Sequence, residues 1–273
     1  MMNTNGPLLK ILFIGDVVGK GGRSAVKKLV SVLKDRYHAS FVIVNAENSA
    51  NGAGISKTCI DDMNTAPIDV YTAGDHIWDQ KSFEHEINMY QNVLRPANMS
   101  TLQPGKGYGV FRNPAGGEVA VINLSGKVFM RESAYCPFEC VEKILQNLPK
   151  TVKCIFVDIH AEATSEKAAL AWMLDGKVTA VVGTHTHVQT ADGRVLPGGT
   201  AFLSDVGMTG GHDSVLGRNV KDVVKKFRTG MPTRLEVTEN RIRLDYCVVT
   251  YELNTGKAVE IVNSSEFYEP ENI

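Results

Sequence analysis

The stretch VTAVVGTHTH, residues 178–187, places an apolar run directly before two histidines. VTAVVG (178–183) has the length and the β-branched composition of a buried strand. His185 and His187 follow two positions apart, and side chains at i and i+2 of an extended chain point the same way. We therefore expect both imidazoles to reach one metal ion or two adjacent ions. The alternative is a polar strand end that carries two histidines without binding a metal.

Metal-binding groups also follow several other strand-like runs. In parallel α/β sheets, ligands collect beyond the carboxyl ends of the strands. Singly, these groups have structural explanations, such as a cap for Asp16 or a turn for Glu47 and Asn48. Together, carboxylates at one sheet edge would repel one another, and a bound cation removes that repulsion. The runs and groups are ILFIG (11–15) with Asp16, SFVIVN (40–45) with Glu47 and Asn48, IDVYTA (68–73) with Asp75 and His76, CIFVDIH (154–160) with His160, and AFL (201–203) with Ser204 and Asp205.

The ligand types indicate the kind of metal site. Carboxylates, an amide and imidazoles without a nearby thiolate are typical of a catalytic site rather than a structural one. This mixture suits Mn, Fe or Zn better than Ca. The groups are too many for one ion, so we expect two metals bridged by a carboxylate, an arrangement that serves phosphoryl transfer. GDVVGK (15–20) is not a phosphate-binding P-loop, because only three residues separate its glycines and Gly21 follows its lysine.

The pattern of apolar runs predicts an α/β fold. Strand-like runs alternate with helical patterns at 24–37, 57–64, 140–148 and 164–174, and NPAGG (113–117) predicts a hairpin between 107–112 and 118–124. Thr164 is a candidate cap of the helix over 164–174. The last third is strand-rich, with RLEVTE (234–239) and RIRLDYCVVTYEL (241–253) joined by a tight turn at Glu239-Asn240, and one helix near 218–228. We predict one domain over residues 1–273, with a layered α/β/β/α plan.

Composition sets limits on the function. The 273 residues carry a net charge of −1, which argues against bulk nucleic-acid binding but leaves room for a local nucleotide site. The five cysteines include no C-x-x-C pair and are expected to be core thiols of a cytoplasmic protein. LLKILFIG (8–15) lacks the basic region of a signal peptide, so we expect a buried strand. No apolar run approaches ~18 residues, so we expect no membrane span.

Taken in order, the motifs resemble those of the calcineurin-like metallophosphoesterases, and most closely their bacterial YmdB-like branch. The similarity covers essentially the whole chain. It rests on GD (15–16), NAEN (45–48), GDH (74–76), RPAN (95–98), DIHAEATSEK (158–167), VVGTHTHVQTAD (181–192) and SDVGMTG (204–210). The resemblance implies a four-layer α/β/β/α sandwich of the metallo-dependent phosphatase type. It also implies hydrolysis of small phosphodiesters such as 2′,3′-cyclic AMP.

The resemblance further implies a role for each site residue. Asp16, Glu47, Asn48 and His187 would hold a first metal, and Glu47 would bridge to a second metal held by Asp75, His160 and His185. Iron is the expected metal, with manganese or zinc as alternatives. A metal-held hydroxide would be the nucleophile, and His76 would be the general acid. Asp79 is expected to cap a helix or to contact a site residue, rather than to bind metal.

Two positions depart from the wider pattern. Val18 stands where the superfamily usually has a histidine, a feature that the YmdB-like branch shares. Asp75 stands where the family normally has asparagine, and its carboxylate could tighten a trivalent ion, repel the substrate phosphate, or sit protonated and mimic the amide. A phosphomonoesterase using the same site and a weakly active regulatory protein are therefore kept as alternative functions. The expected partner is a small phosphorylated substrate, with a homo-oligomer as an open possibility.

Overall fold

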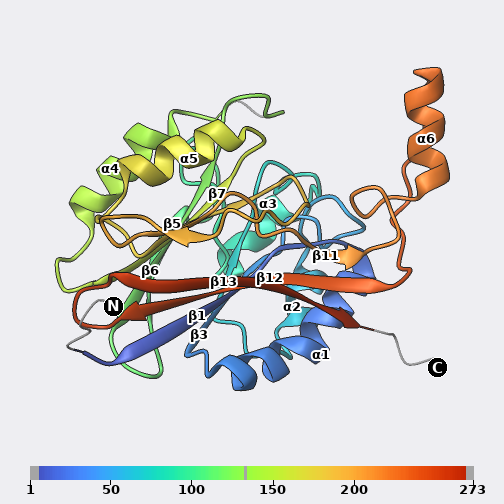
Figure 1. Cartoon of the computed structure of the whole chain (residues 1–273). Coiled ribbons are helices and arrows are strands. Elements are labelled where there is room, and N and C mark those ends of the chain that lie inside the picture. Colours follow the sequence, from blue (N-terminus) through green and yellow to red (C-terminus); the bar gives the residue numbers. More distant parts are fainter. Residues whose placement is uncertain (1–5, 132–133, 269–273) are drawn as a thin grey trace.

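Two β-sheets lie face to face at the centre of the molecule, and helices cover their outer faces (Figure 1). The computed structural model describes residues 6–131 and 134–268. The first sheet has the order β2-β11-β12-β1-β3-β4, with β13 paired to the other side of β12. Its strands are β1 (Leu8–Ile14), β2 (Asp16–Val17), β3 (Phe41–Asn45), β4 (Val70–Thr72), β11 (Met208–Gly211), β12 (Ile242–Glu252) and β13 (Ala258–Tyr268).

The second sheet has the order β5-β6-β7-β8-β10-β9. Within it β6, β7, β8 and β10 are parallel, and in the first sheet β1, β3 and β4 are parallel. The carboxyl ends of the parallel strands in each sheet therefore share one edge. The strands are β5 (Tyr108–Arg112), β6 (Glu118–Ser125), β7 (Cys154–His160), β8 (Ala180–Thr184), β9 (Arg194–Val195) and β10 (Ala201–Leu203).

Continuous apolar runs explain why the central strands are buried on both faces. Along β1, Leu12 and Ile14 face the helical layer, whereas Ile11 and Phe13 face the second sheet. The period of two residues along a strand produces this alternation. Phe13 meets Phe156 of β7 with ring centroids 5.1 Å apart, so an aromatic pair lies between the two sheets.

The helices form the outer layers of the predicted four-layer α/β/β/α sandwich. The helices α1 and α2 pack on the first sheet, and α4 and α5 pack on the second. None of the helices in the described ranges is both long enough and apolar enough to cross a membrane. The helical segments are α1 (Gly19–Tyr37), α2 (Lys57–Met63), α3 (Phe83–Glu86), the 3₁₀ segment η1 (Ile87–Met89), α4 (Pro137–Asn147), α5 (Thr164–Met173) and α6 (Val220–Thr229).

The structure corrects several expected elements. RLEVTE (234–239) is not a strand, since it makes only an isolated bridge between Val237 and Arg218, and it is not fully buried. The Glu239-Asn240 turn therefore does not join two strands. The real C-terminal hairpin is β12–β13, and β13 escaped prediction because half-exposed polar residues interrupt its apolar pattern. Thr164 does not cap α5, whose N-cap is Ala163.

One helix also differs from expectation at its start, whereas α6 agrees with the helix predicted near 218–228. The helix α1 begins at Gly19, five residues before the predicted start at 24. Gly22 is required there because a Cβ would overlap the Thr209 carbonyl of β11. The helix α6 projects from the body of the molecule (Figure 1) and leaves Val224 and Phe227 exposed.

Candidate metal centre

Four side chains converge where the carboxyl ends of strands from both sheets meet. They are Glu47, Asp75, His160 and His185, and one ligand atom from each lies within 4.8 Å of the others. Glu47 follows β3 and Asp75 follows β4 of the first sheet, whereas His160 ends β7 and His185 follows β8 of the second. We call these four residues the quartet.

The His160 ring occupies the centre of the quartet. Its Nε2 atom lies 3.0 Å from Glu47 Oε1, 3.2 Å from Asp75 Oδ1 and 3.0 Å from His185 Nδ1. Burial lowers the pKa of His160, but the neighbouring carboxylates raise it well above its ordinary value. Burial and the charge of His160 lower the pKa of His185 to about 4, so its imidazole is neutral at pH 7. A neutral imidazole is the form that binds metal.

Asp75 is ionised in this arrangement. Burial raises the pKa of its carboxyl, but the close contact with His160 Nε2 at 3.2 Å and the charge of that imidazole hold the pKa below its usual value. Of the three alternatives for this position, the structure therefore disfavours a protonated carboxyl that mimics the family's amide. The carboxylate adds a full negative charge to the quartet.

Gly74 makes room for the quartet. A Cβ at this position would overlap the Glu47 carboxylate and the His160 ring. The backbone before Asp75 therefore passes so close to the ligand atoms that only glycine fits.

Buried oxygens without hydrogen bonds indicate that a cation fits here. Asp16 Oδ1 and Asp75 Oδ1 are both buried, and neither accepts a well-aligned hydrogen bond from a described residue, although His160 Nε2 lies 3.2 Å from Asp75 Oδ1. Buried polar atoms are normally satisfied, so each such atom points to an absent partner. The other Asp16 oxygen, Oδ2, accepts the His185 backbone N–H at 3.0 Å. Burial raises the pKa of Asp16 well above its ordinary value, and a cation would relieve this penalty.

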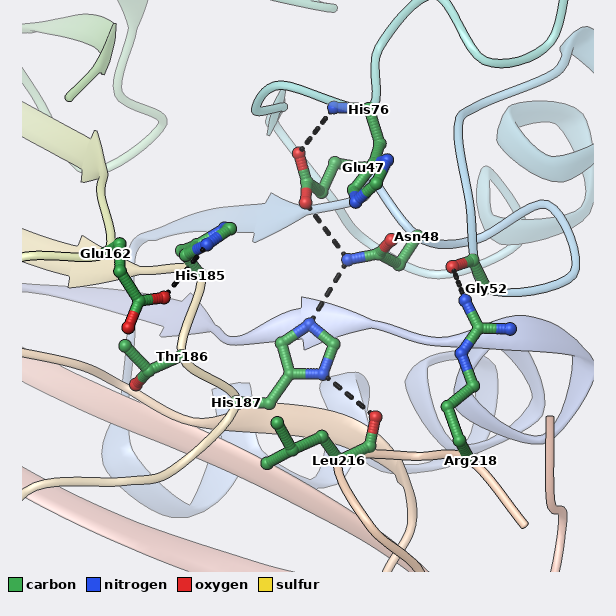
Figure 2. A pocket seen from close by; sticks show the side chains of 10 residues that line it. All are labelled: Glu47, Asn48, Gly52, His76, Glu162, His185, Thr186, His187, Leu216 and Arg218. Carbon is green, nitrogen blue, oxygen red and sulfur yellow. Dashed lines mark hydrogen bonds and ion pairs between the residues drawn. The ribbon is translucent and has the colours of Figure 1, made fainter. Parts of the chain in front are cut away.

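Asn48 lies between Glu47 of the quartet and His187 (Figure 2). His187 Nδ1 lies 3.3 Å from the Leu216 carbonyl, so it donates to it, and Nε2 faces the Asn48 amide nitrogen at 3.2 Å. The same amide nitrogen donates to Glu47 Oε1 at 3.0 Å. The nitrogen of Asn48 therefore faces the site, whereas a metal would be held by its oxygen. A cation bound here would turn the Asn48 amide around, so that its oxygen and not its nitrogen faces the site.

The backbone of the histidine segment differs from the extended chain that we expected. The strand β8 ends at Thr184, and both His185 (φ 102°) and His187 (φ 62°) adopt positive φ. Such conformations are costly outside glycine and cluster at functional sites. The two imidazoles line the same cavity, but a strained turn rather than a strand period brings them there. We call residues 185–187 the histidine turn.

His76 lies at the opposite side of this cavity from His187 (Figure 2). Its Nδ1 atom lies 2.8 Å from Asp79 Oδ2, and the Arg131 guanidinium donates to the same carboxylate at 3.2 Å. Asp79 is therefore a hydrogen-bond partner of His76, one of the two roles expected for it. The cavity has a volume of about 330 Å³, and Arg218 is the only lysine or arginine among the described residues that line it.

Comparison with known proteins agrees with this geometry. Residues 12–263 match the YmdB-like protein family. The chain belongs to this family. It is 44% identical to the 2′,3′-cyclic-nucleotide 2′-phosphodiesterase of Bacillus subtilis over 93% of this chain and 95% of that protein. Two crystal structures each match with a TM-score of 0.89 and 34% identity over 96% of this chain. One is a novel phosphatase from Mycoplasma pneumoniae, covered over 94% of its length, and the other is a hypothetical protein from Thermus thermophilus, covered completely.

In this YmdB-like chain the buried side chains of Asp158 and Thr184 orient His160, a role that the sequence pattern did not reveal. Asp158 accepts the Thr184 hydroxyl at 2.8 Å, and His160 Nδ1 lies 2.9 Å from the same hydroxyl. Because that hydroxyl hydrogen goes to Asp158, His160 Nδ1 must donate to Thr184. Nε2 is thereby the atom that faces the quartet. An aspartate inside the apolar run CIFVDIH was the available signal, since a buried carboxylate needs partners.

Proposed function

We propose that this YmdB-like chain is a metal-dependent hydrolase of small phosphodiesters such as 2′,3′-cyclic AMP. The observation that carries the proposal is the quartet, four ligand atoms within 4.8 Å of one another, opening into a polar cavity. The identity of 44% to a 2′,3′-cyclic-nucleotide 2′-phosphodiesterase supports the reaction type. A cavity of about 330 Å³ suits a small ligand rather than a polymer.

The quartet residues Asp75, His160 and His185 would hold one cation, with Glu47 shared with a second. Asp16, Asn48 and His187 would complete the second set. Iron is our proposed metal, with manganese and zinc as alternatives. When bound, the cations supply Lewis-acid activation of phosphorus and of water. The buried oxygens of Asp16 and Asp75 that lack a well-aligned hydrogen bond support both positions.

His76 is placed to protonate the leaving oxygen. Its Nδ1 contact with Asp79 fixes the ring and leaves Nε2 for the substrate. When the P–O bond breaks, the leaving oxygen takes the His76 proton, and imidazole has the basicity for this role near neutral pH. Arg218 would contact a part of the substrate away from the quartet, because its guanidinium is held by the Gly52 carbonyl on the side of the cavity away from His185 (Figure 2).

The five cysteines are free, and three of them are buried. This supports a cytoplasmic location, where thiols stay reduced.

The test uses purified full-length protein with its metal content measured by mass spectrometry. Hydrolysis of 2′,3′-cyclic AMP and of bis-p-nitrophenyl phosphate is assayed after loading with Fe²⁺ or Mn²⁺. We expect metal-dependent turnover that chelation abolishes and that His76→Ala strongly reduces. No turnover with either loaded metal, for the wild type as for His76→Ala, would refute the proposal.

A phosphomonoesterase is the second candidate, favoured by the structural match to a phosphatase from Mycoplasma pneumoniae. The same two-metal chemistry serves both reactions, so the shape of the cavity decides between them. A panel that compares nucleoside monophosphates with cyclic diesters separates the two. Faster release of phosphate from the monophosphates would favour the monoesterase.

A further inference from the structure

Two buried carboxylates hold consecutive backbone N–H groups of the histidine turn. His185 N donates to Asp16 Oδ2 at 3.0 Å, and Thr186 N donates to Asp205 Oδ2 at 3.0 Å. Asp16 is already a proposed metal ligand. Asp205 is not among the residues that line the cavity, so it contacts the turn from behind. Its contact falls on the residue between the two histidines.

Asp205 is itself fixed by a buried lysine. Lys167 of α5 places Nζ 2.8 Å from Asp205 Oδ2, and both side chains are 1% exposed. Asp205 Oδ1 accepts the Gly207 backbone N–H at 2.9 Å. Burying two charges is costly and is tolerated where the ions are paired and hydrogen-bonded. Three donors therefore bind this carboxylate: the Lys167 ammonium and the backbone N–H groups of Thr186 and Gly207.

Gly183 shows that the local structure accommodates this lysine. A Cβ at Gly183 would overlap the Ser204 carbonyl oxygen and would lie 2.7 Å from Lys167 Cδ. Because Gly183 has no side chain, the Lys167 side chain can pack against it and extend from α5 to Asp205 beyond the end of β10. The Lys167 ammonium thereby reaches the Asp205 carboxylate, which contacts the histidine turn at Thr186 N.

We propose that Asp205, paired with Lys167, is a positioning residue that holds the histidine turn in its positive-φ conformation, with His185 and His187 directed at the metals. The inference rests on the proposed metal-dependent function. Backbone conformations of this kind persist only where surrounding contacts over-determine them, and the bond from Thr186 N is such a contact. Without it, the turn relaxes and the two imidazoles lose their shared direction.

The test measures Mn²⁺ binding to chelator-treated, full-length protein by isothermal titration calorimetry, beside a thermal melt. Asp205→Asn keeps the shape but removes the negative charge, and its amide nitrogen must face either the Gly207 N–H or the Lys167 ammonium and the Thr186 N–H. Lys167→Met/Asp205→Leu replaces the ion pair with apolar side chains of similar volume, an exchange that often preserves stability. The half-buried Thr186 N–H then has no protein acceptor. We expect both variants to fold and to bind Mn²⁺ roughly 10- to 100-fold more weakly, as for other groups that orient metal ligands.

Asp175→Asn is the matched control. Asp175 also accepts two backbone N–H groups, from Gly198 at 2.7 Å and Thr200 at 3.3 Å, but at the opposite end of β10. We expect its Mn²⁺ affinity to stay within about twofold of wild type, because distant sites act independently. A double variant that folds and binds Mn²⁺ like the wild type would overturn the positioning role. If the double variant does not fold, wild-type Mn²⁺ affinity in Asp205→Asn would overturn it instead. A wild type that binds no Mn²⁺ would instead overturn the proposed function, and this inference with it.

Discussion

His160 Nε2 lies 3.0 Å from Glu47 Oε1, although the two residues belong to different sheets. The contact joins the end of β7 to the loop after β3 at the centre of the quartet. It is buried, with neither side chain more than 1% exposed. The site is therefore assembled across the sandwich rather than on one element, and its geometry follows the packing between the sheets.

Gly74→Ala tests how tightly the quartet is packed. The added Cβ would overlap Glu47 and His160, so we expect the two side chains to move apart and metal binding to fall by at least about tenfold. Overpacking of this kind costs roughly 1–3 kcal/mol of stability. Metal content after purification and a chemical denaturation curve measure the two effects. Unchanged metal content would show that the quartet is looser than the structure indicates.

Asp75→Asn tests the carboxylate that the resemblance marks as unusual at this position. Because Asp75 is ionised and lies 3.2 Å from His160, we expect removal of its charge to weaken cation binding by about tenfold. Metal titration and turnover of bis-p-nitrophenyl phosphate are measured together. A large gain in activity would instead support a naturally impaired, regulatory protein.

Thr184→Val tests the contact that orients His160. The change keeps the side-chain shape but removes the acceptor for Nδ1, while Asp158 keeps its bonds from Asn45 and Thr72. We expect metal affinity or activity to fall by roughly 10- to 100-fold. Thr179→Val is the control, because Thr179 is equally buried and its hydroxyl bonds Gly256 and Ile155 away from the site. Equal loss of activity in both variants would point to general destabilisation.

His76→Gln tests the proton donor. We expect kcat for 2′,3′-cyclic AMP to fall by about 10²- to 10⁴-fold with the metal content unchanged. A substrate with a p-nitrophenolate leaving group needs little protonation, so its hydrolysis should fall much less. Asp79→Asn should reproduce the pattern in weaker form, because it disturbs the ring through the 2.8 Å contact. Equal losses on both substrates would argue against an acid role.

Much of the fold and the site followed from local patterns. Apolar runs located the central strands because those strands are buried on both faces, and the groups behind them met because parallel strands share an edge. In this way Glu47, Asp75, His160 and His185 were all anticipated. β13 was missed because its alternating, half-exposed residues lack an apolar run, and RLEVTE misled because its β-branched pattern finds no partner strand.

The rest depended on contacts between distant residues. The positive φ of His185 and His187 is invisible in sequence, since neither residue is glycine. The pairing of Lys167 with Asp205 spans 38 positions in the sequence, and the Lys167 side chain packs where a Cβ at Gly183 would clash with it. In the sequence Asp158 is only one residue of an apolar strand, and its contact with the Thr184 hydroxyl beside His160 appears only in the folded structure. Local propensity finds elements, but long-range packing decides which polar groups serve the site.

The division of the quartet between the two sheets also affects how the chain assembles. No fragment that ends before β8 contains His185, and neither sheet alone contains the quartet. A cation therefore meets its complete set of ligands only after β8 has joined the sandwich. Because a ligand stabilises the state that binds it, the metal would stabilise the chain only once the two sheets have packed together. Removal of the metal should then weaken the contacts between the two sheets at the quartet before either sheet unfolds.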